Sequence, residues 1–177
     1  DLVPTYRSLL VYYDPMAISA PDLQTKLDRL VHSLSERKLD NPRNVYIPTL
    51  YGGEYGPDLE FVAQYVGLSS DEVVALHSGT YYLVYMMGFS PGFPYLGGLP
   101  AQLTMPRLET PRTEVPAGSV GIAESQTGVY PVASPAGWRL IGRTPIIMFD
   151  PESDPPSLLS PGDHVHYVPI ATEQEYL

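Results

Sequence analysis

Residues 120–149 read VGIAESQTGVYPVASPAGWRLIGRTPIIMF, and the expected fold class follows from this stretch. Runs of β-branched, aliphatic and aromatic residues alternate in it with Gly and Pro, which punctuate the turns between strands. The runs predict short strands at 120–123, 129–132, 138–141 and 146–149, and similar runs predict strands at 81–87 and 164–170. Evenly spaced short strands of this kind indicate a closed or nearly closed β-barrel.

The region before residue 80 adds helices to this pattern. Apolar residues at helical spacing predict a helix over residues 21–34. Two shorter helices are predicted, one from about Pro57 and one after the capping box of Ser69 and Glu72. Strands are predicted at 3–13 and 45–51, a polar linker at 35–44 and a Gly/Pro/aromatic loop at 88–99. The expected class is therefore α+β, mainly β, with the two short helices plugging or flanking the barrel.

The composition excludes several classes of partner. The chain has 177 residues, 10 of them Lys or Arg and 20 Asp or Glu, and its net charge of −10 would repel a nucleic-acid backbone. No apolar run is long enough to span a bilayer, and the start of the chain lacks the features of a signal peptide. Cysteine is absent, which excludes disulfides, thiolate nucleophiles and Cys-ligated metals. We therefore expect a cytoplasmic protein with neither a nucleic-acid nor a membrane partner.

The four histidines differ in what their positions suggest. His32 lies near the end of the first helix and is expected to face solvent. His164 and His166 alternate on one strand and share a face, but the spacing supplies no third ligand, so a polar strand face is expected and no metal site is predicted. His77 ends a helix just before a barrel strand. It has either a role in a pocket or a role in capping that helix.

A second group of candidates consists of polar side chains set among Gly and Pro. Arg107 and Arg112 could each clamp a carboxylate through a bidentate pair. Their alternative role is to pin loops by donating to backbone carbonyls, and the spacing does not separate the two roles. The candidates for a pocket that binds a small acidic or amide ligand are His77, Arg107, Arg112, Gln126, Thr127 and Tyr130.

The aromatic residues around the Gly- and Pro-rich loop are candidates for a partner surface. Phe89, Phe93, Tyr95 and Trp138 form this set, although the loop residues among them could equally form a small core of their own. Ser90 lies in Gly-Phe-Ser-Pro-Gly, whose surroundings do not resemble a nucleophile elbow that feeds a helix. No phosphate-binding loop with a Gly-Lys pair is present. We therefore expect this chain to bind no cofactor of its own.

The run of residues 88–99, GFSPGFPYLGGL, resembles the signature loop of the family formed by the B subunits of 5-oxoprolinases. This family has also been called allophanate hydrolase subunit 1 and the Kip-type histidine-kinase inhibitor family. Ala136 departs from the family's usual Gly, and the stretch after Ile47-Pro48 lacks its usual Cys. Further matching stretches, in order along the chain, are YGGEYGPDL at 51–59, PR at 106–107 and 111–112, VPAGSVGIA at 115–123, QTGVYP at 126–131, GRTP at 142–145 and PGD at 161–163.

The resemblance implies a two-part structure. Residues 1–42 would be the C-terminal part of a small α/β N-terminal domain, truncated here, and residues 43–177 a cyclophilin-like β-barrel. It also implies a non-autonomous subunit of an ATP-dependent amidohydrolase, which acts with the A and C subunits of the same enzyme to open the lactam of 5-oxoproline to glutamate. ATP would be used by the assembled complex.

Three other functions remain open at this stage. One is an allophanate hydrolase or urea-carboxylase-type carboxyltransferase subunit, which would need a biotin-bearing partner. Another is a regulatory protein that inhibits a sporulation-type sensor histidine kinase through the barrel surface. The third, peptidyl-prolyl isomerisation, rests on fold analogy alone and has no cue in the sequence.

Overall fold

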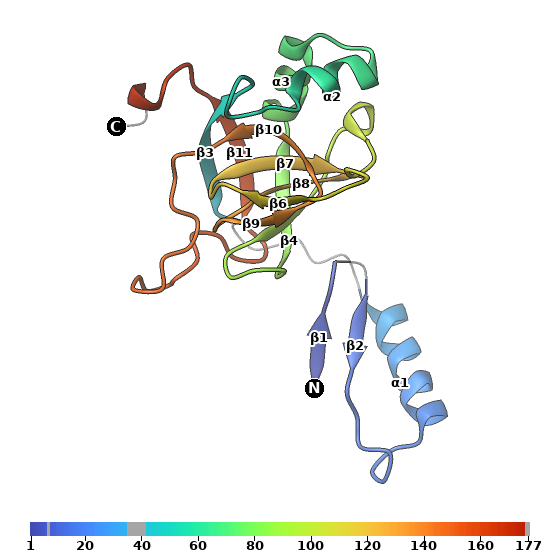
Figure 1. The fold of residues 1–177 in the computed structure, drawn as a ribbon. Helices are drawn as coiled ribbons and strands as arrows, with labels where there is room; N and C mark the ends of the chain where they lie inside the picture. Colours follow the sequence, from blue (N-terminus) through green and yellow to red (C-terminus); the bar gives the residue numbers. More distant parts are fainter. Residues whose placement is uncertain (7, 35–41, 176–177) are drawn as a thin grey trace. The chain divides into compact units, whose positions relative to one another are not determined.

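The computed structural model describes residues 1–6, 8–34 and 42–175, so most of the predicted linker at 35–44 lies outside the described residues. The chain divides into two compact units, Asp1–Asn41 and Pro42–Leu177. Each unit has its own sheet, drawn in Figure 1. None of the helices within the described residues combines the length and the hydrophobicity that crossing a membrane requires.

The first unit is a β-hairpin followed by a helix. Strands β1 (Leu2–Pro4) and β2 (Leu9–Val11) pair in antiparallel fashion, and α1 spans Ala20–Ser33 behind the N-cap residue Ser19. The prediction of one strand over residues 3–13 is therefore wrong. The chain turns because the Thr5 hydroxyl donates to the Ser8 carbonyl and accepts from the Ser8 amide, both at 3.0 Å, and such local bonds compete with an extended strand.

The second unit is a closed seven-stranded barrel, which confirms the predicted fold class. Around the barrel the strand order is β10, β3, β11, β4, β5, β8, β7, and β7 pairs again with β10. All pairs are antiparallel except β3 with β11. The strands are β3 (Asn44–Tyr51), β4 (Tyr81–Met87), β5 (Pro94–Gly97), β7 (Ser119–Ala123), β8 (Gln126–Val129), β10 (Arg139–Arg143) and β11 (His164–Pro169). A separate two-stranded sheet joins β6 (Arg112–Val115) to β9 (Ser134–Ala136).

Several strand predictions need correction. The loop predicted at 88–99 contains β5, where Gly97 leaves room for the ring of Tyr85 to lie against the backbone. The strand predicted at 129–132 lies earlier, because a two-residue turn at Glu124 and Ser125 sets Gln126 opposite Ala123. Residues 146–149 form no strand, and only Phe149 makes an isolated bridge. The short strands β6 and β9 were not predicted.

Two short helices close one end of the barrel, as Figure 1 shows. Helix α2 (Leu59–Val66) ends at Gly67, which adopts the left-handed conformation with φ of 72°. Helix α3 (Ser70–Ser78) begins with the predicted capping box of Ser69 and Glu72. The buried side of each helix packs on the main core, and α3 carries His77 into it.

The barrel unit has two separate apolar clusters. Alternate residues of the strands fill the barrel interior and form the larger cluster. The smaller cluster forms where the opposite faces of β7 and β10 meet the β6–β9 sheet. Its buried members are Phe93, Val115, Ala123, Tyr130, Ala136, Trp138 and Leu140. This smaller cluster positions the candidate site.

Candidate functional site

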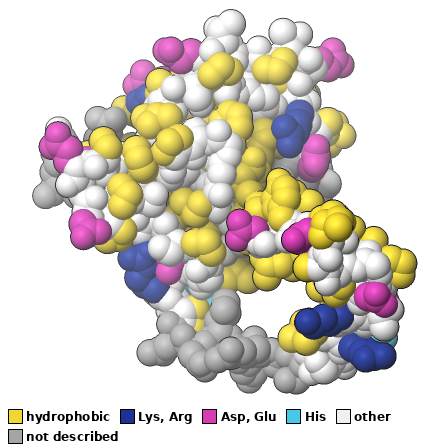
Figure 2. Space-filling view, turned by 90° about the horizontal axis from the view of Figure 1, so that it is seen from below, with side chains coloured by type: hydrophobic (Ala, Val, Ile, Leu, Met, Phe, Trp, Pro, Cys, Tyr) yellow, Lys and Arg dark blue, Asp and Glu magenta, His cyan; other side chains and the backbone are white. Residues whose placement is uncertain are grey.

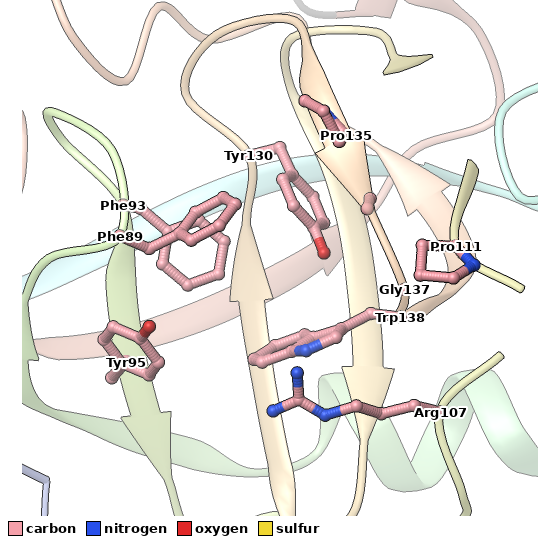
Figure 3. A pocket seen from close by; sticks show the side chains of 10 residues that line it. Phe89, Phe93, Tyr95, Arg107, Pro111, Tyr130, Pro135, Gly137 and Trp138 are labelled. Atoms are coloured by element: carbon pink, nitrogen blue, oxygen red, sulfur yellow. The ribbon is translucent and has the colours of Figure 1, made fainter. Parts of the chain in front are cut away.

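A pocket of about 300 Å³ opens beside the smaller cluster, and Figure 3 shows the side chains around it. We call it the aromatic pocket. It brings together two of the polar pocket candidates, Arg107 and Tyr130, with all four of the aromatic candidates for a partner surface. Its lining residues are Phe89, Phe93, Tyr95, Arg107, Pro111, Tyr130, Pro135, Ala136, Gly137 and Trp138.

Phe93 is the centre of the aromatic wall. Its ring centroid lies 5.2 Å from those of Tyr95 and Tyr130 and 5.6 Å from that of Trp138. All three contacts are edge-to-face, the arrangement that aromatic quadrupoles prefer. Phe93 and Trp138 are almost fully buried, which favours the small-core interpretation for them over a partner surface. The wall is therefore rigid and already formed.

The signature loop delivers Phe89 to the rim of the pocket. The Gly88 amide donates to the Phe93 carbonyl at 3.0 Å and closes a turn in which Phe89 has φ of 67°. A bulky residue seldom adopts this left-handed conformation, and strained backbone of this kind clusters at ligand sites. Phe89 is 64% exposed, yet its ring still meets the edge of Phe93 at 5.4 Å. Of the four aromatic candidates, it is the one most available to a partner.

Arg107 is the only charged residue among those that line the pocket. Its guanidinium carbon lies 5.9 Å from the centre of the Trp138 ring, and Figure 3 shows it beside the indole. Its Nε donates to Glu124 Oε1 at 3.2 Å, and both side chains are more than half exposed. Within the described residues its two terminal amino groups have no acceptor, so they remain available to a ligand.

Tyr130 adds a hydroxyl group to the pocket. Burial raises the pKa of Tyr130 to about 12, although the nearby positive charges of Arg107 and Arg112 act in the opposite direction. The phenol is therefore protonated at neutral pH and can donate or accept a hydrogen bond. Figure 3 shows its oxygen on the side of Trp138 and Pro111.

Arg112 does not line the aromatic pocket. Its guanidinium pairs with Asp58 Oδ1 at 2.8 Å and donates to the Trp138 carbonyl at 3.5 Å. The second Asp58 oxygen accepts from the Leu140 amide at 2.7 Å. The arginine thus ties β6 to β10 and to the start of α2, which is the loop-pinning role that the sequence left open.

His77 and Thr127 meet inside the barrel, away from the pocket. The Thr127 hydroxyl donates to the Gly121 carbonyl at 3.1 Å, so it must accept from His77 Nε2 at 2.8 Å. His77 Nδ1 then accepts from the Tyr51 hydroxyl at 2.8 Å. Burial lowers the pKa of His77 to about 3, which agrees with a neutral ring. Every polar atom of this imidazole is satisfied by the protein itself.

The other polar candidates take no part in the pocket. Gln126 is buried at the start of β8. The Ser90 hydroxyl is buried and has no hydrogen-bond partner within the described residues, so no base activates it. His164 and His166 point to one side of β11, where His166 stacks on Tyr81 at 4.5 Å. Within the same residues, no group of three or more His, Asp or Glu side chains could hold a metal ion.

Sequence reasoning missed Glu124, Pro111, Pro135 and Ala136. Glu124 carries a usable signal, because it occupies the first central position of a two-residue hairpin turn and has φ of 53°. Glycine is the preferred residue there, so a glutamate at this position suggests a role for its carboxylate. Ala136 stands where the resemblance described above leads us to expect glycine. It lies in β9 without a left-handed backbone, so its methyl group causes no strain and faces the pocket.

The surface of the chain is poor in basic groups. On the face of the molecule in Figure 2, hydrophobic side chains form broad areas and Lys and Arg are sparse. Large aromatic residues elsewhere on the barrel are also exposed, among them Tyr46, Tyr81 and Tyr85. An acidic chain with this surface suits apolar protein contacts better than contacts with polyanions.

Proteins with similar sequences include B subunits of bacterial 5-oxoprolinases. A family model described as carboxyltransferase domain, subdomain C and D, matches residues 1–159. The chain is 46% identical over 187 residues to the 5-oxoprolinase B subunit of Bacillus subtilis (strain 168), covering 99% of this chain and 77% of that protein. It is 56% identical over 135 residues to the 5-oxoprolinase B subunit of Escherichia coli O157:H7, covering 76% of this chain and 62% of that protein.

Solved structures share the fold of this chain. A conserved uncharacterized protein from Pyrococcus horikoshii aligns with a TM-score of 0.73 and 50% identity, covering 100% of this chain and 81% of that one. The urea carboxylase of Kluyveromyces lactis aligns with a TM-score of 0.75, covering 99% of this chain and 18% of that one. Because the identity of the second match is 22%, that match shows a shared fold and nothing more. The chain therefore belongs to the family of carboxyltransferase domains, subdomains C and D, that includes the B subunits of bacterial 5-oxoprolinases.

Proposed function

We propose that this chain is the B subunit of an ATP-dependent 5-oxoprolinase, which opens the lactam ring of 5-oxoproline to give glutamate. The observation that carries the proposal is the identity of 46% and 56% to two bacterial proteins of that name. The aromatic pocket supports it, because a volume of about 300 Å³ suits a small ring.

The chemistry of the reaction suggests a division of labour. Hydrolysis breaks the ring C–N bond, adds the oxygen of water to the carbonyl carbon and leaves a proton on nitrogen. The closed ring is favoured near neutral pH, so ATP hydrolysis must drive its opening. This chain has no cysteine, and its sequence has no phosphate-binding loop. We therefore assign ATP binding to the partner subunits and substrate binding in part to this chain, which holds no cofactor itself.

The proposed partners are the A and C subunits of the same complex. The relatives are themselves named as one subunit of an enzyme, which supports a multi-subunit assembly. Phe89 at the rim of the pocket and the exposed tyrosines of the barrel are apolar surfaces that a partner could cover. A site completed by a partner would also fit a pocket whose lining residues, among those the structure describes, include no His, Asp or Glu.

The proposal is tested by omitting one subunit at a time. The chain is co-expressed with the A and C subunits, and glutamate release from 5-oxoproline is measured with and without ATP. We expect release only when all three subunits and ATP are present. Release by the A and C subunits without this chain would contradict the proposal, as would an assembled complex that releases no glutamate.

A carboxyltransferase function is the second candidate. It is favoured by the description of the matching family and by the fold shared with a urea carboxylase. This function requires a biotin-bearing partner that delivers a carboxyl group. Its signature would be transfer of labelled bicarbonate, through biotin, to a small amide by the complex. Glutamate release that proceeds without biotin would decide against it.

A further inference from the structure

The aromatic pocket has the shape and the polarity of a site for a flat, small ligand. Its walls are the faces and edges of five aromatic rings, which bury a ring without hydrogen-bonding demands. The polar groups set in these walls include the protonated hydroxyl of Tyr130 and the guanidinium of Arg107. A ligand that fits must therefore combine a compact ring with an anionic group.

Arg107 is prepared to receive a carboxylate. In a chain with a net charge of −10, it is the only charge that lines the pocket, and it presents two terminal amino groups with no acceptor in the described residues. A guanidinium fork matches the two oxygens of a carboxylate better than any other side chain does. Its guanidinium carbon lies 5.9 Å from the centre of the Trp138 ring, so the fork lies beside the aromatic wall.

Glu124 already supplies Arg107 with a carboxylate. The side chain reaches the guanidinium from a turn position where its backbone has φ of 53°, a conformation that favours glycine. The ion pair itself is exposed on both sides, at 53% and 63%, and such pairs contribute little to stability. Because the pair is weak and exposed, a ligand in the pocket can displace the Glu124 carboxylate from Arg107.

We propose that the aromatic pocket binds a small ring that carries a carboxylate, that Arg107 grips this carboxylate, and that Glu124 occupies Arg107 until the ligand displaces it. Tyr130 hydrogen-bonds the polar edge of the ring. The ligand class follows from the pocket alone. Its identification with 5-oxoproline, a five-membered lactam with one carboxylate, rests on the proposed function.

The chain contains its own probe, because Trp138 is its only tryptophan and lines the pocket. Tryptophan emission of the full chain is followed while 5-oxoproline is added. The comparison ligands are 2-pyrrolidinone, which is the same ring without the carboxylate, and acetate, which is the carboxylate without the ring. We expect a saturable change with 5-oxoproline, binding at least about tenfold weaker with 2-pyrrolidinone, and no saturation with acetate.

Three variants assign the residues. Arg107→Gln should raise the Kd for 5-oxoproline about tenfold or more, and should leave the Kd for 2-pyrrolidinone unchanged. Glu124→Gln keeps the turn but removes the competing charge, so it should lower the Kd for 5-oxoproline about two- to fivefold. Arg29→Gln removes the same charge from an exposed arginine of the N-terminal unit and should have no effect.

Either of two results would overturn the proposal. One is the absence of any saturable change in Trp138 emission with 5-oxoproline. The other is equal binding by the wild type and by Arg107→Gln with an unchanged far-ultraviolet circular dichroism spectrum. The proposed function and the proposed pocket can be told apart. A complex that hydrolyses 5-oxoproline while the emission of Trp138 in this chain does not change would support the function and contradict the pocket.

Discussion

The layer around His77 and the aromatic pocket have similar compositions but opposite properties. Each surrounds one nitrogen-rich side chain with aromatic rings. In the His77 layer the donors and acceptors of the imidazole are all matched, and the ring is fully buried. In the pocket, Arg107 keeps donors that no acceptor within the described residues matches, and its side chain is half exposed. The comparison teaches that satisfied hydrogen bonds, rather than residue type, separate a structural polar group from one available to a ligand.

The largest expected effect is a loss of stability when the His77 layer is disrupted. His77→Ala removes a fully buried ring and leaves the Tyr51 and Thr127 hydroxyls without it. The cavity and the unpaired groups together should cost about 3–5 kcal/mol of the free energy of unfolding. Urea unfolding of the wild type and the variant measures the difference. Arg107→Ala, the matched change in the pocket, should cost less than about 1 kcal/mol, and equal losses would erase the distinction.

Acid should destabilise the fold through the His77 layer. The folded pKa of His77 is about 3 against 6.5 in the unfolded chain, so the unfolded state binds the proton first. Between these values stability should fall as pH falls, by roughly 1.4 kcal/mol per pH unit from this group. Unfolding curves between pH 6 and pH 4 measure the slope. In His77→Gln the slope should be shallower, and an identical slope would show that another group titrates.

Arg112 should affect stability more than ligand binding. Arg112→Met leaves the Asp58 carboxylate at the start of α2 with the Leu140 amide as its one remaining partner among the described residues. Because the arginine side chain is partly exposed, the expected loss is about 1–3 kcal/mol, less than for a fully buried pair. Asp58→Asn in the same background should recover part of it in urea unfolding. No loss in Arg112→Met would mean that the ion pair does not hold β6 in place.

The smallest expected effect is a gain in stability. Glu124→Gly relieves the left-handed backbone at φ of 53° and gives up only an exposed ion pair. The variant should therefore be more stable by up to about 1 kcal/mol, which thermal unfolding can detect. A loss of stability would indicate that Glu124 serves the fold, and would weaken its interpretation as a displaceable occupant of Arg107.

The barrel could be predicted because the residues that indicate each strand and helix lie close together in the sequence. Short apolar runs between Gly and Pro predicted most strands, and capping residues such as Ser69 predicted the helices. The strands β6 and β9 escaped prediction, since each is short and includes exposed residues, so neither has a clear apolar pattern. The hairpin of β1 and β2 depends on side-chain bonds at Thr5 that interrupt a continuous strand-like composition.

The candidate site could be predicted only in part. Arg107 and Tyr130 were identified as pocket candidates, and the aromatic wall was identified for a different reason. The two arginines have different roles because Arg112 pairs with Asp58, which lies 54 residues away in the sequence. A single sequence does not show this contact. The structural role of His77 was equally hard to predict, because its Nε2 atom meets the Thr127 hydroxyl only in the folded barrel. Long-range pairing of polar groups has no local signature in a single sequence.

The central claim is that Arg107, and not Arg112, serves the substrate. The most direct measurement is the KM for 5-oxoproline of the complex assembled with the A and C subunits, compared between Arg107→Gln and Arg112→Gln. We predict a KM at least about tenfold higher in Arg107→Gln and a KM close to the wild type in Arg112→Gln. The reverse pattern, with the KM raised by the Arg112 change and not by the Arg107 change, would contradict the account.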